Sequence, residues 1–172
     1  MSTFRDRPGS VLECDSGRPA SVPVHRHVDG GGTTTLITDL PYGPRAAEIA
    51  REAVAVALHG ATQADLLDDA RLIGSELATN AFTSGSPPLV LCVDRRSPTA
   101  GSLEVEITMT DGGCSLPGPP SPPVPEEEAE SGRGLVIVEA LADAWSLTTG
   151  THGTRAWCRL TRRALTSPAD TD

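Results

Sequence analysis

The sequence predicts an α+β fold in which a mostly antiparallel sheet carries helices on one of its faces. Three observations indicate this fold. Helical segments lie early in the chain and most strands lie late, residues 103–110 alternate between apolar and polar side chains, and consecutive strands are joined by short polar turns. A chain of 172 residues suits one domain with a hydrophobic core of its own.

The composition divides the chain into three parts. Residues 1–32 mix Pro, Gly, Ser and charged residues with no hydrophobic period, which predicts a disordered or mobile arm. Residues 33–163 hold the regular patterns and are predicted to form the domain. Residues 164–172 are predicted to be a flexible tail.

The domain is predicted to begin with a strand and a helix. The β-branched and apolar run TTTLITDL, residues 33–40, favours a strand. A helix is predicted over residues 44–59, because Pro44 suits a first helical turn and Gly60 follows the helix end. The apolar face of this helix consists of Ala47, Ala50, Val54 and Leu58.

The next helix, predicted over residues 63–83, combines an apolar stripe with polar residues on its margin. Because residues four positions apart share a helix face, Glu76 and Asn80 should leave the helix in nearly the same direction, with Asp69 on the same margin. These side chains should therefore face a cleft. The apolar stripe consists of Leu66, Ala70, Ile73, Leu77 and Ala81.

The Glu76 and Asn80 pair has a chemical interpretation. A carboxylate beside a carboxamide can hold a hard cation and a water molecule against a phosphate. Magnesium prefers oxygen ligands and keeps several waters, so one protein oxygen together with substrate phosphates suffices. In the alternative interpretation, Asn80 bonds a nearby backbone group and Glu76 lies on a solvated face.

The second half of the domain is predicted to hold two strand pairs. Strands over residues 89–94 and 103–110 form an antiparallel pair, and strands over 144–149 and 154–162 form a hairpin. A short helix over 135–143 lies between the pairs. It is preceded by a loop that contains six prolines, which exclude a helix interior and a central strand.

Asp111, at the end of a predicted strand, points to the same cleft. It is followed by Gly112 and Gly113, which let the backbone approach a flat ligand closely. The Asp111 carboxylate could accept a hydrogen bond from an exocyclic amine such as that of adenine. In the alternative interpretation, Asp111 is a solvated residue that opens a turn.

The run Gly132-Arg133-Gly134 leads directly into a predicted helix. Exposed N–H groups at a helix N-terminus and the helix dipole favour a phosphate, and Arg133 could add a charge-assisted contact. Alternatively, the two glycines only end the loop. Thr154 begins the last strand and could direct its hydroxyl into the cleft, or serve only as a strand former.

Charge and composition argue against several function classes. The chain has 14 Lys and Arg against 23 Asp and Glu, a formal charge of −9, which argues against direct binding to nucleic acid or an anionic membrane. No apolar run approaches the ~18 residues that span a bilayer, so a soluble, cytoplasmic protein is expected. The four scattered cysteines are expected to be reduced thiols.

The order of four motifs, SELATNA, DGGCSLP, GRGLVIVEALADAW and GTRAW, is more specific than any one of them. In this order the chain resembles the GHKL ATPases over residues 33–160, and among them the small anti-sigma-factor kinases and histidine-kinase-like ATP-binding domains of bacteria. The resemblance implies a two-layer α/β sandwich of Bergerat type with a mixed, mostly antiparallel sheet. It also implies that ATP and Mg²⁺ are held between the helices and the sheet.

The resemblance implies a role for each matched residue. Asn80 would be the magnesium ligand, and Glu76 would orient or deprotonate the attacking hydroxyl. Asp111 would read the adenine amine, with room provided by Gly113. Thr154 would support the water network around the adenine. The residues bordering the triphosphate would be Gly132, Arg133 and Gly134, and the ATP lid would be the loop over residues 114–131.

The function implied is that of a serine/threonine protein kinase in a bacterial partner-switching system, which phosphorylates a STAS-like anti-anti-sigma partner. Relatives of this kind often form homodimers. The chain departs from the family pattern after Asn80, because residues 82–85 lack the basic or His residue that such proteins often carry there. An acidic run over residues 126–128 should also repel a triphosphate. These departures favour an alternative, a regulatory module that sequesters a sigma factor or another protein. In a third interpretation, the polar residues of the cleft only satisfy the core.

Overall fold

The computed structural model describes residues 24–28, 33–112, 133–150 and 153–163. Within these residues the chain forms three helices and six strands. In chain order they are β1 (Val24–Val28), β2 (Thr34–Leu40), α1 (Ala46–Ala57), α2 (Ala64–Ser84), β3 (Leu89–Arg96), β4 (Ser102–Thr110), α3 (Arg133–Leu141), β5 (Ala144–Gly150) and β6 (Gly153–Arg163).

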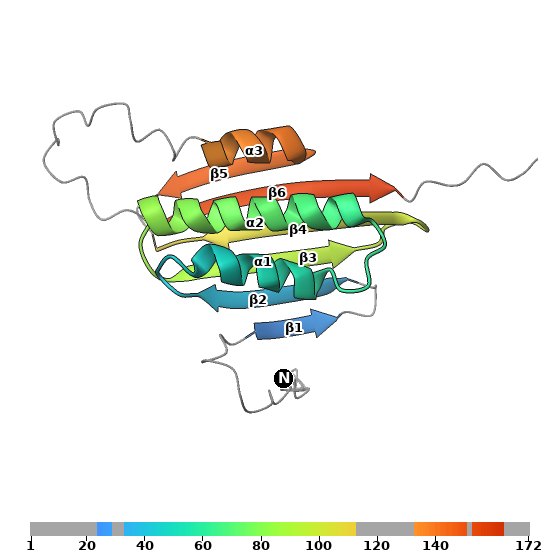
Figure 1. Ribbon diagram of the computed structural model, residues 1–172, viewed down its shortest axis with the longest axis horizontal. Helices are drawn as coiled ribbons and strands as arrows, with labels where there is room; N and C mark the ends of the chain where they lie inside the picture. The colour runs from blue at the N-terminus through green and yellow to red at the C-terminus, as the bar shows by residue number, and fades with distance from the viewer. Residues whose placement is uncertain (1–23, 29–32, 113–132, 151–152, 164–172) are drawn as a thin grey trace, which may run out of the picture.

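The six strands form one sheet in the order β1-β2-β3-β4-β6-β5. Every neighbouring pair is antiparallel, so the expected mixed character of the sheet is wrong for the described strands. All three helices lie on one face, with α1 over β2 and β3, α2 beside α1, and α3 at the β5 edge (Figure 1). The predicted α+β fold with helices on one face is confirmed.

The hydrophobic core lies between the helices and the inner face of the sheet. All five residues of the predicted α2 stripe are buried, and the apolar positions of β4 are buried while its polar positions are more exposed. The 3.6-residue and two-residue periods therefore identified the correct faces. The largest fully buried side chains include Leu36, Leu58, Leu66, Ile73, Leu89, Leu91, Ile107, Met109 and Leu160.

Ile73 offers a direct test of the α2 face. Ile73 is 0% exposed, so its replacement with alanine should lower the free energy of unfolding by about 2–5 kcal/mol through lost burial and a residual cavity. The preceding residue, Leu72, is 42% exposed, and Leu72→Ala should cost less than about 1 kcal/mol. Denaturant unfolding of both variants measures the difference. Equal losses would contradict this orientation of the helix.

The strand β1 was not predicted. Val24–Val28 pairs with β2, placing His25 opposite Ile37 and His27 opposite Thr35. The predicted disordered or mobile arm over residues 1–32 therefore includes a strand at these five residues. The side chains of residues 25–28 are all exposed at the edge of the sheet, so the strand carries no apolar face that a sequence pattern could reveal.

The other elements differ from their predicted limits by one or two residues. The helix α3 begins at Arg133 and ends at Leu141, two residues earlier at each end than predicted. The strand β3 continues two residues further, to Arg96. Such shifts are usual, because the ends of helices and strands fray and their limits are defined only to within one or two residues. Among the described helices, none combines the length and the hydropathy needed to cross a membrane.

Candidate functional site

A cavity of about 300 Å³ lies between the C-terminal half of α2, the start of α3 and the β4-β6-β5 part of the sheet. This volume is at the lower end of the range for small-ligand sites. Most of its walls are apolar, and a few polar side chains converge on it. The lining residues are Leu77, Asn80, Ala81, Ser84, Met109, Asp111, Leu135, Leu147, Thr149, Thr154 and Ala156.

Glu76 and Asn80 meet the first turn of α3 at Gly134. A Cβ atom added to Gly134 would stand 2.8 Å from Asn80 Nδ2 and 3.2 Å from Glu76 Oε2. Gly134 is buried, and both side chains are half-buried. Glycine therefore allows the α3 backbone to approach the two polar groups more closely than any other residue could. The predicted convergence of these three residues is present in the structure.

Asp111 lies at the end of β4 and is buried, so the interpretation as a solvated turn residue is wrong. Its Oδ1 accepts a hydrogen bond from the Thr154 backbone N–H at 3.0 Å. The Asp111 backbone N–H donates to the Thr154 carbonyl at 3.0 Å. This double link fixes the carboxylate at the β6 end of the cavity.

Thr154 and Thr149 face each other across the β5-β6 pair, and both line the cavity. Thr154 was predicted as a site residue, whereas Thr149 was not. Leu147 and Thr149 are two positions apart on β5, so strand alternation could have placed them on one face. Nothing in the sequence shows, however, that this face would border a cavity and not the core.

A family model for the histidine kinase-like ATPase domain matches residues 41–160, which is more than half of the chain. The chain belongs to the histidine kinase-like ATPase family. The predicted GHKL resemblance is thus confirmed, and family membership supports ATP as the ligand. The match begins after β2 and ends within β6, so it includes the whole cavity.

A solved structure with a similar fold is described as the RsbU and RsbW domains of Rv1364c from Mycobacterium tuberculosis. The TM-score is 0.53 at 23% sequence identity, and the similarity covers 76% of this chain and 33% of that one. This chain therefore spans about a third of that longer protein. The comparison with curated proteins gave no match.

Several predicted site residues of this ATPase-family domain lie outside the described part of the chain. These are Gly113, Gly132 and the lid predicted over residues 114–131. Arg133 begins α3, but its side chain is not described. Their roles remain predictions.

Asp69 was predicted to face the cleft from the margin of α2. This prediction is wrong, because the Asp69 side chain forms an ion pair with β6. Its Oδ2 lies 2.8 Å from Arg162 Nη2 of β6, and Arg162 Nη1 is 3.8 Å from Asp143 Oδ2. Asp69 therefore ties α2 to the sheet, about two helical turns before Glu76.

The oxygen-bearing side chains at Gly134 fit a magnesium ion of the kind this family implies. The Asn80 carboxamide supplies a hard oxygen donor beside a backbone approach that a Cβ would fill, and the Glu76 carboxylate lies next to it. Within the described residues there is no group of three or more His, Cys, Asp or Glu that could hold a metal. A site with few protein ligands agrees with the preference of Mg²⁺ for water and phosphate oxygens.

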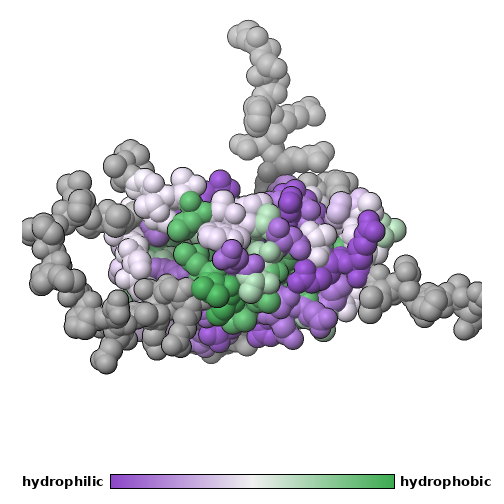
Figure 2. Space-filling view, turned by 90° about the horizontal axis from the view of Figure 1, so that it is seen from above, coloured by the Kyte–Doolittle hydropathy of each residue, from purple (hydrophilic) through white to green (hydrophobic). Residues whose placement is uncertain are grey.

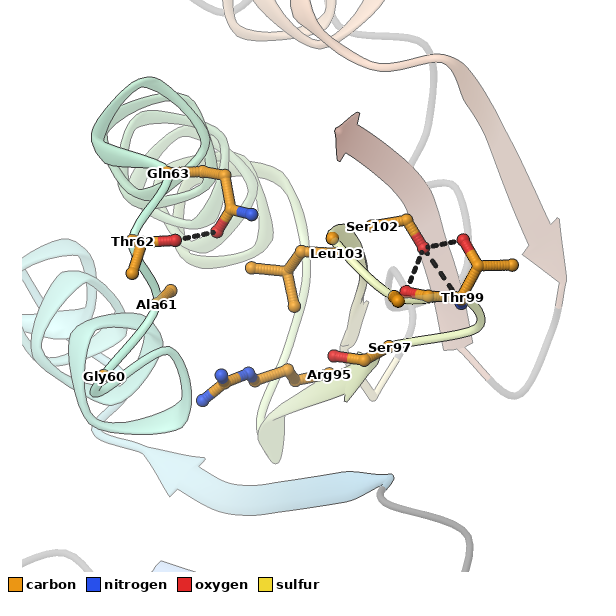
Figure 3. Close-up of a pocket in the computed structure, with 11 residues that line it drawn as sticks. Gly60, Ala61, Thr62, Gln63, Arg95, Ser97, Thr99, Ser102 and Leu103 are labelled. Atoms are coloured by element: carbon orange, nitrogen blue, oxygen red, sulfur yellow. Dashed lines mark hydrogen bonds between the residues drawn. The ribbon is translucent and has the colours of Figure 1, made fainter. Parts of the chain in front are cut away.

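A second cavity, of about 290 Å³, lies at the other end of α2 (Figure 3). It is bordered by the α1-α2 connection around Thr62 and Gln63 and by the β3-β4 turn around Thr99 and Ser102. Arg95 extends along it and donates from Nη1 to the His59 carbonyl at 2.9 Å. Among the residues that the structure describes, no carboxylate lines this cavity, so they do not provide the acceptor that an adenine amine requires.

The outer edge of the ATPase-family domain is apolar next to the first cavity. Viewed from above, where α3 and β5 form the edge of the molecule, hydrophobic residues gather in one patch (Figure 2). The exposed large hydrophobic residues of α3 and β5 are Val136, Trp145 and Leu147. Leu147 also lines the cavity, so the apolar surface continues into the cavity wall.

Cys92 and Cys158 are free thiols, as predicted. Burial raises the pKa of Cys92 to about 11, with a further contribution from the neighbouring Asp94 carboxylate. Burial likewise raises the pKa of Cys158 to about 12. Both thiols are therefore protonated at neutral pH and are poor nucleophiles, so neither supports covalent catalysis.

Proposed function

We propose that this domain binds ATP with Mg²⁺ and acts as a serine/threonine protein kinase of a partner-switching system, with a STAS-like anti-anti-sigma protein as its substrate. The observation that supports this most is the meeting of Glu76 and Asn80 with the α3 backbone at Gly134, at the side of a cavity that contains Asp111. In this proposal, the Asp111 side of the cavity would bind the purine, and the Asn80 side would bind the phosphates.

The purine end is formed by apolar side chains and one buried carboxylate. Met109, Leu147 and Ala156 provide apolar walls for a flat base. Asp111 accepts the hydrogen bond of an exocyclic amine. A carboxylate accepts several hydrogen bonds at once, so this bond is compatible with the one from Thr154. Adenine carries such an amine at the edge that would meet Asp111.

The phosphate end is formed by α2 and by the N-terminus of α3. The helix α3 has nine residues, and its first N–H groups have no partner within the helix, so they favour the negative charge of a phosphate. Asn80 would hold Mg²⁺ beside them. When bound, the ion neutralises charge on the phosphates.

Glu76 is the residue that acts on the substrate hydroxyl. It lies one helical turn before Asn80 and points to the same backbone at Gly134. Its carboxylate orients the hydroxyl of the partner and accepts its proton as the hydroxyl oxygen bonds to the γ-phosphorus of ATP. The bond from that phosphorus to the β,γ-bridging oxygen breaks in the same step, and ADP leaves. Phosphoryl transfer needs mostly positioning and electrostatic stabilisation, which these groups can supply.

A second candidate is a module that binds ATP but sequesters a sigma factor or another protein without phosphorylating it. The turn after Asn80 favours this alternative. Phe82 packs edge-on against Tyr42 with ring centroids 5.3 Å apart, and the Thr83 hydroxyl donates to the Thr79 carbonyl at 2.9 Å. Within the described α2, no basic side chain follows Asn80 to contact a phosphate.

Incubation of the wild-type chain with γ-labelled ATP, Mg²⁺ and purified STAS-domain proteins separates the two candidates. The kinase proposal predicts that label accumulates on a serine or threonine of the partner, and that omission of Mg²⁺ prevents it. A control without this chain establishes the background. Formation of a stable complex with a partner, without transfer of label, would support the sequestering module.

A further inference from the structure

Tyr42 links the start of α1 to the end of α2. It lies in the connection between β2 and α1, and its hydroxyl donates to the Gly85 carbonyl at 2.9 Å. Its ring meets Phe82 of α2 edge-on at an interplanar angle of 74°. Tyr42 is 49% exposed and does not belong to the buried core.

The residue that Tyr42 holds is in direct contact with Asp111. A Cβ atom added to Gly85 would stand 2.5 Å from both Cγ and Oδ2 of Asp111, so the glycine backbone lies against the carboxylate. The next residue, Ser86, accepts a hydrogen bond from the Gly112 N–H at 2.7 Å. The turn after α2 therefore borders Asp111 at Oδ2, whereas Thr154 bonds Oδ1.

We propose that Tyr42 is a positioning residue for adenine recognition, which acts by holding Gly85 against the Asp111 carboxylate. The proposal rests on the proposed function, in which Asp111 accepts the adenine amine. Thr154 fixes Oδ1 through a backbone N–H, and Gly85 limits the movement of Oδ2. Without the Tyr42 hydroxyl, the Gly85 turn can move away from Oδ2. The carboxylate keeps its bond to the Thr154 N–H but can then turn Oδ2 away from the orientation that meets the amine.

The test is Tyr42→Phe, which removes the hydroxyl and keeps the ring that packs on Phe82. Calorimetry in the presence of Mg²⁺ measures the dissociation constants of ATP and of purine riboside triphosphate, which lacks the 6-amine. The wild type should prefer ATP by at least about tenfold, because deletion of the amine removes a hydrogen bond that the buried Asp111 carboxylate accepts from ATP. In Tyr42→Phe this preference should fall about threefold, through weaker binding of ATP alone.

Thr83→Val is the matched control. It also removes one hydroxyl near the end of α2, but that hydroxyl donates to the Thr79 and Asn80 carbonyls and not to Gly85. The preference for ATP should stay at the wild-type value in this variant. A structural effect of losing a surface hydroxyl would lower the unfolding temperature of either variant without changing the ratio of the two affinities.

The outcomes distinguish this inference from the proposed function. Absence of ATP binding in the wild type would contradict both. A wild-type preference that is lost in Asp111→Asn but unchanged in Tyr42→Phe would leave the proposed function standing and overturn the role of Tyr42. An equal weakening of both nucleotides in Tyr42→Phe would also overturn it, because positioning of Asp111 affects only the ligand with an amine.

Discussion

Replacing Asn80 with alanine is expected to abolish Mg²⁺-dependent ATP binding, with affinity lowered by at least about 100-fold. Changes to groups that only support a metal ligand already cost about 10–100-fold, and loss of the ligand itself costs more. Asn80 lies beside Gly134 at the start of α3, where the triphosphate would meet the helix N-terminus. Calorimetry with ATP, in the presence of Mg²⁺ and of EDTA, measures the effect.

Thr79→Ala is the control for this prediction. Thr79 precedes Asn80 on α2, is exposed, and donates its hydroxyl to the Ser75 carbonyl of its own helix at 2.9 Å. Its replacement should leave ATP affinity within about twofold of the wild type, because surface substitutions away from a site change free energies by about 0.5 kcal/mol or less. If Asn80→Ala retains the wild-type affinity for Mg²⁺ and ATP, the magnesium role of Asn80 is wrong.

The local periodicity of the sequence predicted helices and strands that have one buried face. The strand β5 was also predicted, although none of its residues is buried. The α2 stripe from Leu66 to Ala81 and the alternation of β4 are both set by burial against one layer, and both are confirmed. The strand β1 has no such pattern, since it adds to the sheet edge through backbone pairing with β2. Backbone pairing leaves no mark on side-chain hydropathy.

The candidate site could be predicted only in part for a related reason. The four-residue spacing of Glu76 and Asn80 is local, so the sequence showed that they share a face. The approach of Gly134 to both side chains depends on how α3 packs against α2, and no local pattern encodes it. The order of the motifs predicted that these three residues meet, because the chain resembles a family with a common fold. That prediction came from the resemblance and not from the local pattern of the sequence.

Long-range polar contacts were beyond prediction from spacing. The spacing between Asp69 and Glu76 places both residues on the same margin of α2, so the spacing alone predicts that Asp69 faces the cleft. The Asp69 carboxylate instead pairs with Arg162 of β6. A charged partner 93 positions away decides the orientation of that side chain. The bond from Tyr42 to Gly85 is another such case, because neither residue has a pattern that indicates the other.

Replacing Glu76 with glutamine is expected to lower the rate of phosphoryl transfer to the partner by about 10²–10⁴-fold, while ATP affinity changes by less than about threefold. Glutamine keeps the size and one oxygen of the side chain, so it still fits beside Gly134, but it cannot accept the proton of the attacking hydroxyl. Single-turnover transfer of labelled phosphate to a STAS-domain partner, with calorimetry of ATP binding, measures the two effects separately.

Glu48→Gln is a control with the same change of charge at a distance from the cavity. Glu48 is exposed on α1, where it pairs with Arg45 at 3.4 Å, and it should affect neither transfer nor binding. A matching loss of ATP affinity in Glu76→Gln would assign Glu76 to nucleotide binding. Transfer at the wild-type rate would exclude it as the base. A slow rate with intact binding is the expected result, because it shows that Glu76 acts in the transfer step and not in nucleotide binding.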